Sequence, residues 1–283
     1  MSAITVSGLR KAYGGREVLH GISFAVEQGE VFALLGPNGA GKTTTVEILE
    51  GYRKRDDGDV QVLDVDPGRA GSAFRARIGI VLQSSAVYPL LSVHEIVSLF
   101  AGYYPAPRRP EEVIELVGLD GRRDARVRTL SGGQLRRLDL ALALVGDPEL
   151  VFLDEPTTGF DPAARRHAWA TIRDLRSLGK SILLTTHYME EAQGLADRVA
   201  ILSEGEIVGT GSPQELLSDH ALVEIRYRRN GSEVVIATEE PTRVLNELTA
   251  QALADGEELE GLEVHRRSLE DVYLQLTGED EGE

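Results

Sequence analysis

The sequence predicts an α/β fold whose core is a mainly parallel sheet wrapped by helices. Short apolar runs alternate with helical patterns through most of the chain, and this alternation is typical of parallel sheets with crossover helices. A length of 283 residues with a hydrophobic content of 42% can build one large domain, or a medium domain and a small one. We expect the first three strands to form an early antiparallel, hairpin-like part.

The individual elements follow from apolar runs and from helix start and stop signals. A helix is expected from Lys42 to about Leu49, and the clearest helix is 162–178. The latter has Asp161 as its N-cap, Pro162 at its first position and Gly179 just past its end. Strands are expected at 4–9, 22–26, 31–35, 60–63, 78–82, 150–153, 181–185, 199–202 and 206–208.

Charge is spread unevenly along the chain. Residues 1–203 carry 24 basic and 26 acidic side chains, whereas residues 204–283 carry 6 and 20, so the second part supplies −14 of the net −16. We therefore expect a first domain at 1–219, a small accessory domain at 220–278 and a disordered acidic tail at 279–283. An acidic tail repels a nucleic-acid backbone, so no nucleic-acid partner is expected.

Composition also narrows the expected location of the chain. No window approaches the roughly 18 consecutive apolar residues of a membrane-spanning helix, and the N-terminus lacks the apolar core of a signal peptide. We expect the protein to stay in the cytoplasm. The absence of cysteine excludes disulfides, thiolate metal sites and cysteine nucleophiles.

The segment GPNGAGKT, residues 36–43, matches the phosphate-binding pattern G-x-x-x-x-G-K-[ST] in its required context of strand, loop and helix. Glycines let successive backbone N–H groups turn toward phosphate oxygens, and the helix N-terminus adds partial positive charge. Lys42 adds a full positive charge, and Thr43 is the expected Mg²⁺ ligand. The sequence thus predicts a site for nucleotide phosphates.

The segment LVFLDEP, residues 150–156, is a buried strand that ends in two carboxylates. Asp154 is expected to hold a Mg²⁺-bound water, and Glu155 lies one residue nearer the nucleotide. Glu155 is therefore the candidate general base for an attacking water. Acids also occur at strand ends simply because these ends meet solvent, so the assignment depends on the neighbouring phosphate loop.

The segment LSGGQLRR, residues 130–137, places a serine and two glycines before a strongly helical run. Such a helix start exposes backbone N–H groups and is a ready anion site, to which the Ser131 hydroxyl adds one more donor. Because the phosphate loop already holds one nucleotide, a second anion site makes sense for a nucleotide bound to another subunit. The alternative is an N-cap serine, which explains Ser131 but not Gly132 and Gly133.

This ordered set of motifs resembles the nucleotide-binding subunit of ATP-binding cassette (ABC) transporters over about residues 3–215. The resemblance implies a P-loop NTPase fold of ABC type, ATP and Mg²⁺ as cofactors, and a head-to-tail dimer around two ATP. In that dimer the signature residues of one subunit contact the γ-phosphate held by the other. The implied nucleotide-binding residues are Gly36, Pro37, Asn38, Gly39, Ala40, Gly41, Lys42, Thr43, Thr44, Ser131, Gly132, Gly133 and Gln134.

Four further positions match the family one at a time. Tyr13 matches the aromatic residue that stacks on adenine, and Asp161 matches the acid that crosses the dimer interface. Gln83 matches the glutamine that contacts Mg²⁺ and links the site to the membrane partner. His187 matches the histidine that contacts the γ-phosphate and orients Glu155. The chain departs from the family at Phe160, where leucine is usual, and this difference bears on packing at the interface.

The family resemblance also implies a helical subdomain, here about 84–146, and a separately encoded transmembrane permease. Ser92 and Glu95 form a capping box before a helix with an apolar stripe at 93, 96, 97 and 100. The stripe either packs on its own domain or borders a groove for a short cytoplasmic helix of the permease. Both can hold if the turn around Tyr88, Pro89 and Leu90 meets the partner.

The tail is expected to hold two strands joined at Asn230–Gly231, a helix at 241–253 and a strand near 262–265. Its end, residues 268–278, is similar to the C-terminus of the daunorubicin-type drug-resistance exporter ATPases. A dimer-stabilising or merely soluble appendage remains an alternative for the tail.

We thus expect the ATPase of a bacterial exporter, on the cytoplasmic face of the cell membrane. Drugs, lipids and other hydrophobic or polymeric compounds are open as substrates. A soluble ABC ATPase acting on ribosomes or DNA is the alternative, although the two-cassette and coiled-coil features of such proteins are missing here. A nucleotide-binding regulator would need a broken catalytic set.

Overall fold

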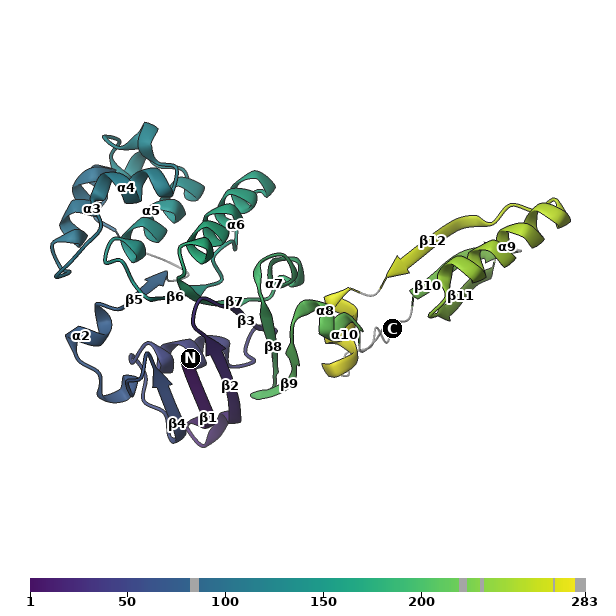
Figure 1. Ribbon diagram of the computed structural model, residues 1–283, viewed down its shortest axis with the longest axis horizontal. Coiled ribbons are helices and arrows are strands. Elements are labelled where there is room, and N and C mark those ends of the chain that lie inside the picture. The colour runs from purple at the N-terminus through teal and green to yellow at the C-terminus, as the bar shows by residue number, and fades with distance from the viewer. Residues whose placement is uncertain (82–86, 219–222, 230–231, 267, 278–283) are drawn as a thin grey trace. The chain divides into compact units, whose positions relative to one another are not determined.

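A computed structural model of the chain describes residues 1–81, 87–218, 223–229, 232–266 and 268–277 (Figure 1). The chain divides into two compact units, Met1–Thr210 and Gly211–Glu283. Among the described residues no helix combines the length and the apolar character that crossing a bilayer requires.

A three-stranded antiparallel sheet forms one part of the first unit, in the order β2-β1-β4. Its strands are β1 (Ser2–Tyr13), β2 (Arg16–Glu27) and β4 (Asp57–Val62). A tight turn at Gly14 and Gly15 joins β1 to β2, and both glycines have positive φ values of 56° and 84°, which favour glycine.

The core of the first unit is a six-stranded sheet in the order β5-β6-β7-β3-β8-β9, and the pairs from β5 to β8 are parallel. These parallel strands are separated in the sequence by helices, as the α/β prediction requires. The strands are β3 (Val31–Leu35), β5 (Ile78–Val81), β6 (Leu150–Asp154), β7 (Ser181–Thr186), β8 (Arg198–Ser203) and β9 (Glu206–Gly211).

The predicted fold class is confirmed. The prediction that the first three strands form the antiparallel part was wrong for the third strand. The third strand, β3, lies inside the parallel sheet between β7 and β8, and β4 pairs with β1 in its place. The reason is burial: all five residues of β3 are buried, as in a parallel strand covered on both faces, whereas β4 alternates between exposed and buried positions.

Helices flank the parallel sheet in the first unit (Figure 1). The predicted helix α1 (Lys42–Leu49) follows β3, and the predicted helix α6 (Pro162–Ser177) connects β6 to β7. Between β7 and β8 lies α7 (Met189–Leu195). The two sheets share one core, in which the rings of Phe24 on β2 and Phe32 on β3 stack with centroids 5.4 Å apart.

A helical part lies between β5 and β6. It holds α3 (Val93–Ala101), α4 (Pro110–Leu116) and α5 (Gly132–Leu144), with the short 3₁₀ turns η2 (Asp120–Arg122) and η3 (Val127–Thr129). Ser92 and Glu95 form the expected capping box. The side chains at 93, 96 and 97 are fully buried, so the apolar stripe of α3 packs inside its own unit. Before β5 lie η1 (Pro67–Arg69) and α2 (Ser72–Arg75).

The second unit contains an antiparallel sheet in the order β11-β10-β12. Its strands are β10 (Val223–Arg229), β11 (Ser232–Thr238) and β12 (Glu260–Arg266), and α9 (Pro241–Asp255) packs against β10. The turn expected at Asn230–Gly231 lies outside the described residues. The strand and helix positions agree with the sequence prediction to within a few residues.

The division of the chain falls earlier than the boundary expected after residue 219. The short helix α8 (Pro213–Ser218) packs against α10 (Leu269–Thr277), so it belongs to the second unit. Leu216, Leu269 and Val272 are buried in this unit. The residues at 267 and beyond 277, including the acidic tail predicted to be disordered, lie outside the described part.

Candidate functional site

The loop from Gly36 to Gly41 connects β3 to α1, and its own packing requires glycine at both ends. A Cβ added at Gly36 would lie 2.2 Å from the carbonyl oxygen of Leu202, and one added at Gly41 would lie 2.6 Å from Leu19 Cδ2. Gly41 also has a φ of 108°. The loop is therefore shaped so that backbone amides, rather than side chains, line its inner surface.

Lys42, the first residue of α1, is 5% exposed and folds back over this loop. Its ammonium group donates hydrogen bonds to the carbonyl oxygens of Gly36 at 2.6 Å and Pro37 at 3.0 Å. Burial lowers the pKa of Lys42, while the carboxylates of Glu155 and Asp154 oppose this shift. The charge is thus confined at the mouth of the loop, where Asn38, Gly39 and Thr43 are exposed.

Two carboxylates meet this cation at the end of β6. Asp154 accepts a hydrogen bond from the Thr185 hydroxyl of the neighbouring strand β7. A Glu155 carboxylate oxygen lies 3.8 Å from Lys42 Nζ, and the Glu155 side chain is 11% exposed. Glu155 has a φ of 46°, which is uncommon for a residue with a side chain and typical of a constrained functional site.

A second predicted catalytic residue, His187, follows β7 and joins the cluster, whereas Gln83, the third, lies outside the described residues. Its Nδ1 lies 3.2 Å from Glu155 Oε1, and the other Glu155 oxygen accepts a hydrogen bond from the Thr158 hydroxyl at 3.2 Å. The strands β6, β7 and β3 are parallel neighbours, so their carboxyl ends meet at one edge of the sheet. This topology brings Lys42, Asp154, Glu155 and His187 together from three strand ends.

The cluster suits a nucleotide-bound Mg²⁺ better than a metal held by protein alone. Among the described residues no three metal-ligating side chains converge. Magnesium usually takes one or two protein ligands, with phosphates and waters supplying the rest. Asp154 and the exposed Thr43 hydroxyl provide such a donor set beside the phosphate loop, whereas Gln83, the third expected ligand, lies outside the described residues.

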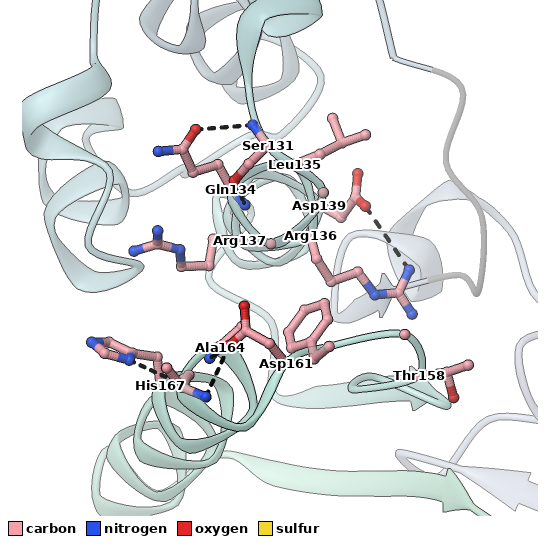
Figure 2. A pocket seen from close by; sticks show the side chains of 15 residues that line it. Ser131, Gln134, Leu135, Arg136, Arg137, Asp139, Thr158, Asp161, Ala164 and His167 are labelled. Atoms are coloured by element: carbon pink, nitrogen blue, oxygen red, sulfur yellow. Dashed lines mark hydrogen bonds and ion pairs between the residues drawn. The ribbon is translucent and has the colours of Figure 1, made fainter.

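A second possible anion site lies at the start of α5. Ser131 is the N-cap of this helix. Its hydroxyl accepts a hydrogen bond from the backbone N–H of Gln134, and the side-chain oxygen of Gln134 accepts one from the backbone N–H of Ser131. An open groove of about 800 Å³ runs between this helix start and the start of α6 (Figure 2). Asp161, across the groove, caps α6 by accepting hydrogen bonds from the amides of Ala163 and Ala164.

The glycines of this helix start differ from those of the phosphate loop. A Cβ added at Gly132 would meet no atom within 4 Å, and one at Gly133 would make an ordinary 3.5 Å contact with Ala164. Neither glycine has a positive φ. Nothing in the described chain requires glycine at 132, although glycine weakens a helix by roughly 0.5–1 kcal/mol relative to alanine.

Tyr13 lies at the turn between β1 and β2, and the residue is 39% exposed. The guanidinium group of Arg53 lies 5.1 Å from the ring centroid, and the ammonium group of Lys11 lies 5.4 Å from it. Leu19, on the partner strand β2 of this hairpin, lies against Gly41 of the phosphate loop. The aromatic ring is thus exposed on the hairpin that packs against the phosphate loop.

Three residues that support the site were missed in the sequence. Arg136 on α5 donates hydrogen bonds to the carbonyl oxygens of residues 154, 155 and 156, and so ties the helix to the end of β6. Burial lowers its pKa. The Thr158 hydroxyl donates a hydrogen bond to the Glu155 carboxylate, and the Thr185 hydroxyl donates one to the Asp154 carboxylate. Thr185 could have been found in the sequence, because it is a polar residue at the end of an otherwise apolar run. No sequence pattern singled out Arg136.

Phe160, where the resembled family usually has leucine, is half-buried. It lines a small apolar pocket with Leu140, Leu153, Pro156 and Ile172, between α5 and α6. Phe160 also lines the open groove between the start of α5 and the start of α6.

Comparison with known proteins identifies relatives over nearly the whole chain. Residues 19–158 match the family model described as ABC transporter. The chain is 38% identical to the Nod factor export ATP-binding protein I of Ralstonia nicotianae, covering 97% of this chain and 94% of that protein. It is 35% identical to the linearmycin resistance ATP-binding protein LnrL of Bacillus subtilis, covering 97% and 98%.

Solved structures give the same result for the fold. A structure described as the ATP-binding subunit of an ABC transporter aligns with a TM-score of 0.72 at 22% identity, over 98% of this chain and 100% of that one. The structure of cbiO1 from Clostridium perfringens, part of the ABC transporter complex cbiONQ, aligns with a TM-score of 0.71 at 29% identity, over 77% and 92%.

Proposed function

Because the chain belongs to the ATP-binding proteins of ABC transporters, which hydrolyse ATP, we propose that it powers export through a separate membrane subunit. The observation that carries the hydrolytic part of this proposal is the convergence of Lys42, Asp154, Glu155 and His187 at three adjacent strand ends. Export is inferred from the relatives. All four positions carry the residue types that hydrolysis needs. A nucleotide-binding regulator without ATPase activity would have lost at least one of them.

Each residue of the cluster has a role in hydrolysis under this proposal. Lys42 and the loop amides bind the β- and γ-phosphates of ATP. Thr43 and Asp154 hold Mg²⁺, which neutralises charge on the phosphates when it is bound. Glu155 accepts a proton from the attacking water, and His187, 3.2 Å away, holds the Glu155 carboxylate in position. Tyr13 offers its exposed ring to the adenine base.

The second part of the proposal is a head-to-tail dimer around two ATP. The bare start of α5 supports it, because the space beside Gly132 is empty in the chain itself and the helix N-terminus favours an anion. Ser131, Gly132, Gly133 and Gln134 would then contact the γ-phosphate held by the partner. Asp161 lies in the same groove and would cross the interface.

The third part concerns what the dimer drives. The relatives named above are an export protein and a resistance protein, so a transmembrane permease at the cytoplasmic face of a bacterial cell membrane is the partner we propose. Drugs, lipids and other hydrophobic or polymeric compounds fit this class. The alternative of a soluble ATPase acting on ribosomes or DNA is not favoured by these relatives.

Replacing Glu155 tests the hydrolytic mechanism and the dimer together. Glu155→Gln keeps the shape of the side chain but removes the base, so we expect hydrolysis to fall by about 10²–10⁴ while ATP binding persists. Size-exclusion chromatography with ATP and Mg²⁺ should then show a trapped dimer. The matched control is Glu190→Gln, an exposed carboxylate on α7. Normal turnover in Glu155→Gln would remove Glu155 as the base, and an ATP-bound monomer would contradict the dimer.

A further inference from the structure

The interface between α6 and α7 is a feature of the first unit that the proposed mechanism does not use. Side chains of α6 at four-residue intervals, and so on one face of the helix, contact α7 or the residue before it. They are Arg165, Trp169 and Arg173. Because α7 starts two residues after His187, one end of this interface lies beside the catalytic cluster.

At that end, Arg165 lies over the ring of Tyr188. The central carbon of the guanidinium group is 4.9 Å from the ring centroid, and both residues are half-buried. The Arg165 Nε atom is buried and has no hydrogen-bond partner among the described residues. Buried donors normally have an acceptor, so this exception needs a reason. The ring supplies one, because the face of a tyrosine attracts a cation, and more strongly where water is excluded.

Tyr188 in turn lies against the catalytic histidine. The ring centroids of His187 and Tyr188 are 4.1 Å apart, and the two ring planes meet at 39°. Consecutive side chains of an extended strand point to opposite sides, so this pairing requires a turn of the backbone. The turn is held by Thr186, whose buried hydroxyl accepts a hydrogen bond from the backbone N–H of Tyr188 at 2.9 Å. The end of β7 therefore places the two rings side by side.

These contacts form a continuous row from α6 to the proposed base. The last contact joins His187 Nδ1 to Glu155 Oε1 over 3.2 Å. The Glu155 side chain is only 11% exposed, whereas that of His187 is 31% exposed, so the histidine is the less enclosed of the two. The torsion that turns an imidazole ring has broad minima and does not fix the ring by itself. A second ring packed against the imidazole restricts this rotation.

We propose that Tyr188 and Arg165 are positioning residues for ATP hydrolysis. Arg165 holds the ring of Tyr188, and Tyr188 keeps the imidazole of His187 turned toward Glu155. This inference rests on the proposed function, because it needs His187 to hold the Glu155 carboxylate during hydrolysis. A misplacement of about 1 Å in a catalytic group can lower a rate by about 10²-fold, so the effect falls on kcat rather than on the binding of ATP.

The alternative is that the whole interface serves only to hold α6 and α7 together. Its middle part fits that role, because Glu191 is fully buried and accepts hydrogen bonds from Thr157 and Trp169. Its far end offers a matched control. Arg173 is an arginine on the same face of α6, eight residues beyond Arg165, and it donates a hydrogen bond to the carbonyl oxygen of residue 194 at 3.2 Å.

The test measures kcat and KM for ATP hydrolysis by the purified full chain with Mg²⁺. Tyr188→Leu removes the ring and Tyr188→Phe keeps it. Arg165→Met removes the charge but keeps a long apolar stem, and Arg173→Met makes the same change at the far end of the interface. The Tyr188 and Arg165 variants are also combined with His187→Ala. A fluorescent-nucleotide titration and the urea midpoint report on ATP binding and on folding.

We expect Tyr188→Leu to lower kcat by about tenfold or more and Arg165→Met by about threefold or more, with KM and ATP affinity unchanged. Tyr188→Phe and Arg173→Met should stay within about twofold of the wild type, because each leaves the ring beside His187 in place. In the His187→Ala background neither Tyr188→Leu nor Arg165→Met should lower kcat further, since both act through the missing imidazole.

Wild-type kcat in Tyr188→Leu would overturn the positioning role and leave the proposed function standing. An equal loss with and without His187 would do the same, because it would show an effect on the fold alone. If Tyr188→Leu lowers the urea midpoint strongly, Arg165→Met decides by the same comparison. Wild-type turnover in His187→Ala would remove His187 from the mechanism, and would overturn both this inference and that part of the proposed function.

Discussion

The buried carboxyl group of Glu50 makes the stability of the first unit depend on pH. Its pKa is raised from a reference of 4.5 to about 8 because burial disfavours the charged form. Between these two values the folded state binds the proton and the unfolded state does not. The free energy of unfolding therefore falls as pH rises through this window.

The size of the effect follows from the shift. A shift of about 3.5 units corresponds to about 5 kcal/mol at complete ionisation, and about 4 kcal/mol of this develops between pH 5 and pH 9. Glu50→Gln carries no titratable proton, so its unfolding free energy should lack this decrease. The difference in stability between Glu50→Gln and the wild type should grow by about 4 kcal/mol over the same range.

Urea denaturation followed by tryptophan fluorescence measures this difference. The chain has one tryptophan, Trp169 on α6, which lies in the same unit as Glu50. Titrations at pH 5, 7 and 9 give the unfolding free energy of both proteins. Parallel curves for the wild type and Glu50→Gln would refute the reasoning, because they would mean that Glu50 titrates alike in the folded and unfolded states.

Three other substitutions test whether a residue is needed for packing or for the binding and hydrolysis of ATP. Gly36→Ala should weaken ATP binding at least tenfold in a fluorescent-nucleotide titration, because its Cβ would lie 2.2 Å from the Leu202 carbonyl oxygen; unchanged affinity would show that the loop can relax. Gly132→Ala should raise stability by up to about 1 kcal/mol, yet lower hydrolysis at least tenfold without weakening ATP binding by the monomer; full activity would contradict the signature contact. Glu191→Ala should lower the unfolding free energy by about 2 kcal/mol or more, since it leaves two hydrogen-bond donors unpaired; an unchanged urea midpoint would refute this.

Local sequence patterns were enough to find most elements of the first unit, but not their full lengths. The expected first strand covered six residues, whereas β1 runs from Ser2 to Tyr13. Its second half contains Arg10 and Lys11, which have no apolar alternation. These residues are held in the strand by pairing with β2 and by ion pairs to Glu17 and Asp56. Cross-strand partners of this kind are set by tertiary structure and cannot be found from periodicity.

The convergence of the site was predictable for a topological reason. Lys42, Glu155 and His187 each follow a buried apolar run, and carboxyl ends of parallel strands meet at one edge. The order of the strands in the sheet was not predicted, because no sequence pattern indicates that β3 lies between β7 and β8. Arg136 was unpredictable from its helix alone, since its partners are backbone carbonyl groups at the end of a distant strand.

Glycines and acids that look alike in the sequence differ once their surroundings are known. At Gly36 and Gly51 the chain itself occupies the space of a side chain, so these glycines are explained by the fold. At Gly132 that space is empty, and at Glu50 burial raises the pKa of the carboxyl group to about 8. Both features cost stability in the isolated chain. Since Gly132 opens toward the proposed second subunit, its cost is most simply offset in the assembly by a phosphate of the nucleotide that this subunit holds.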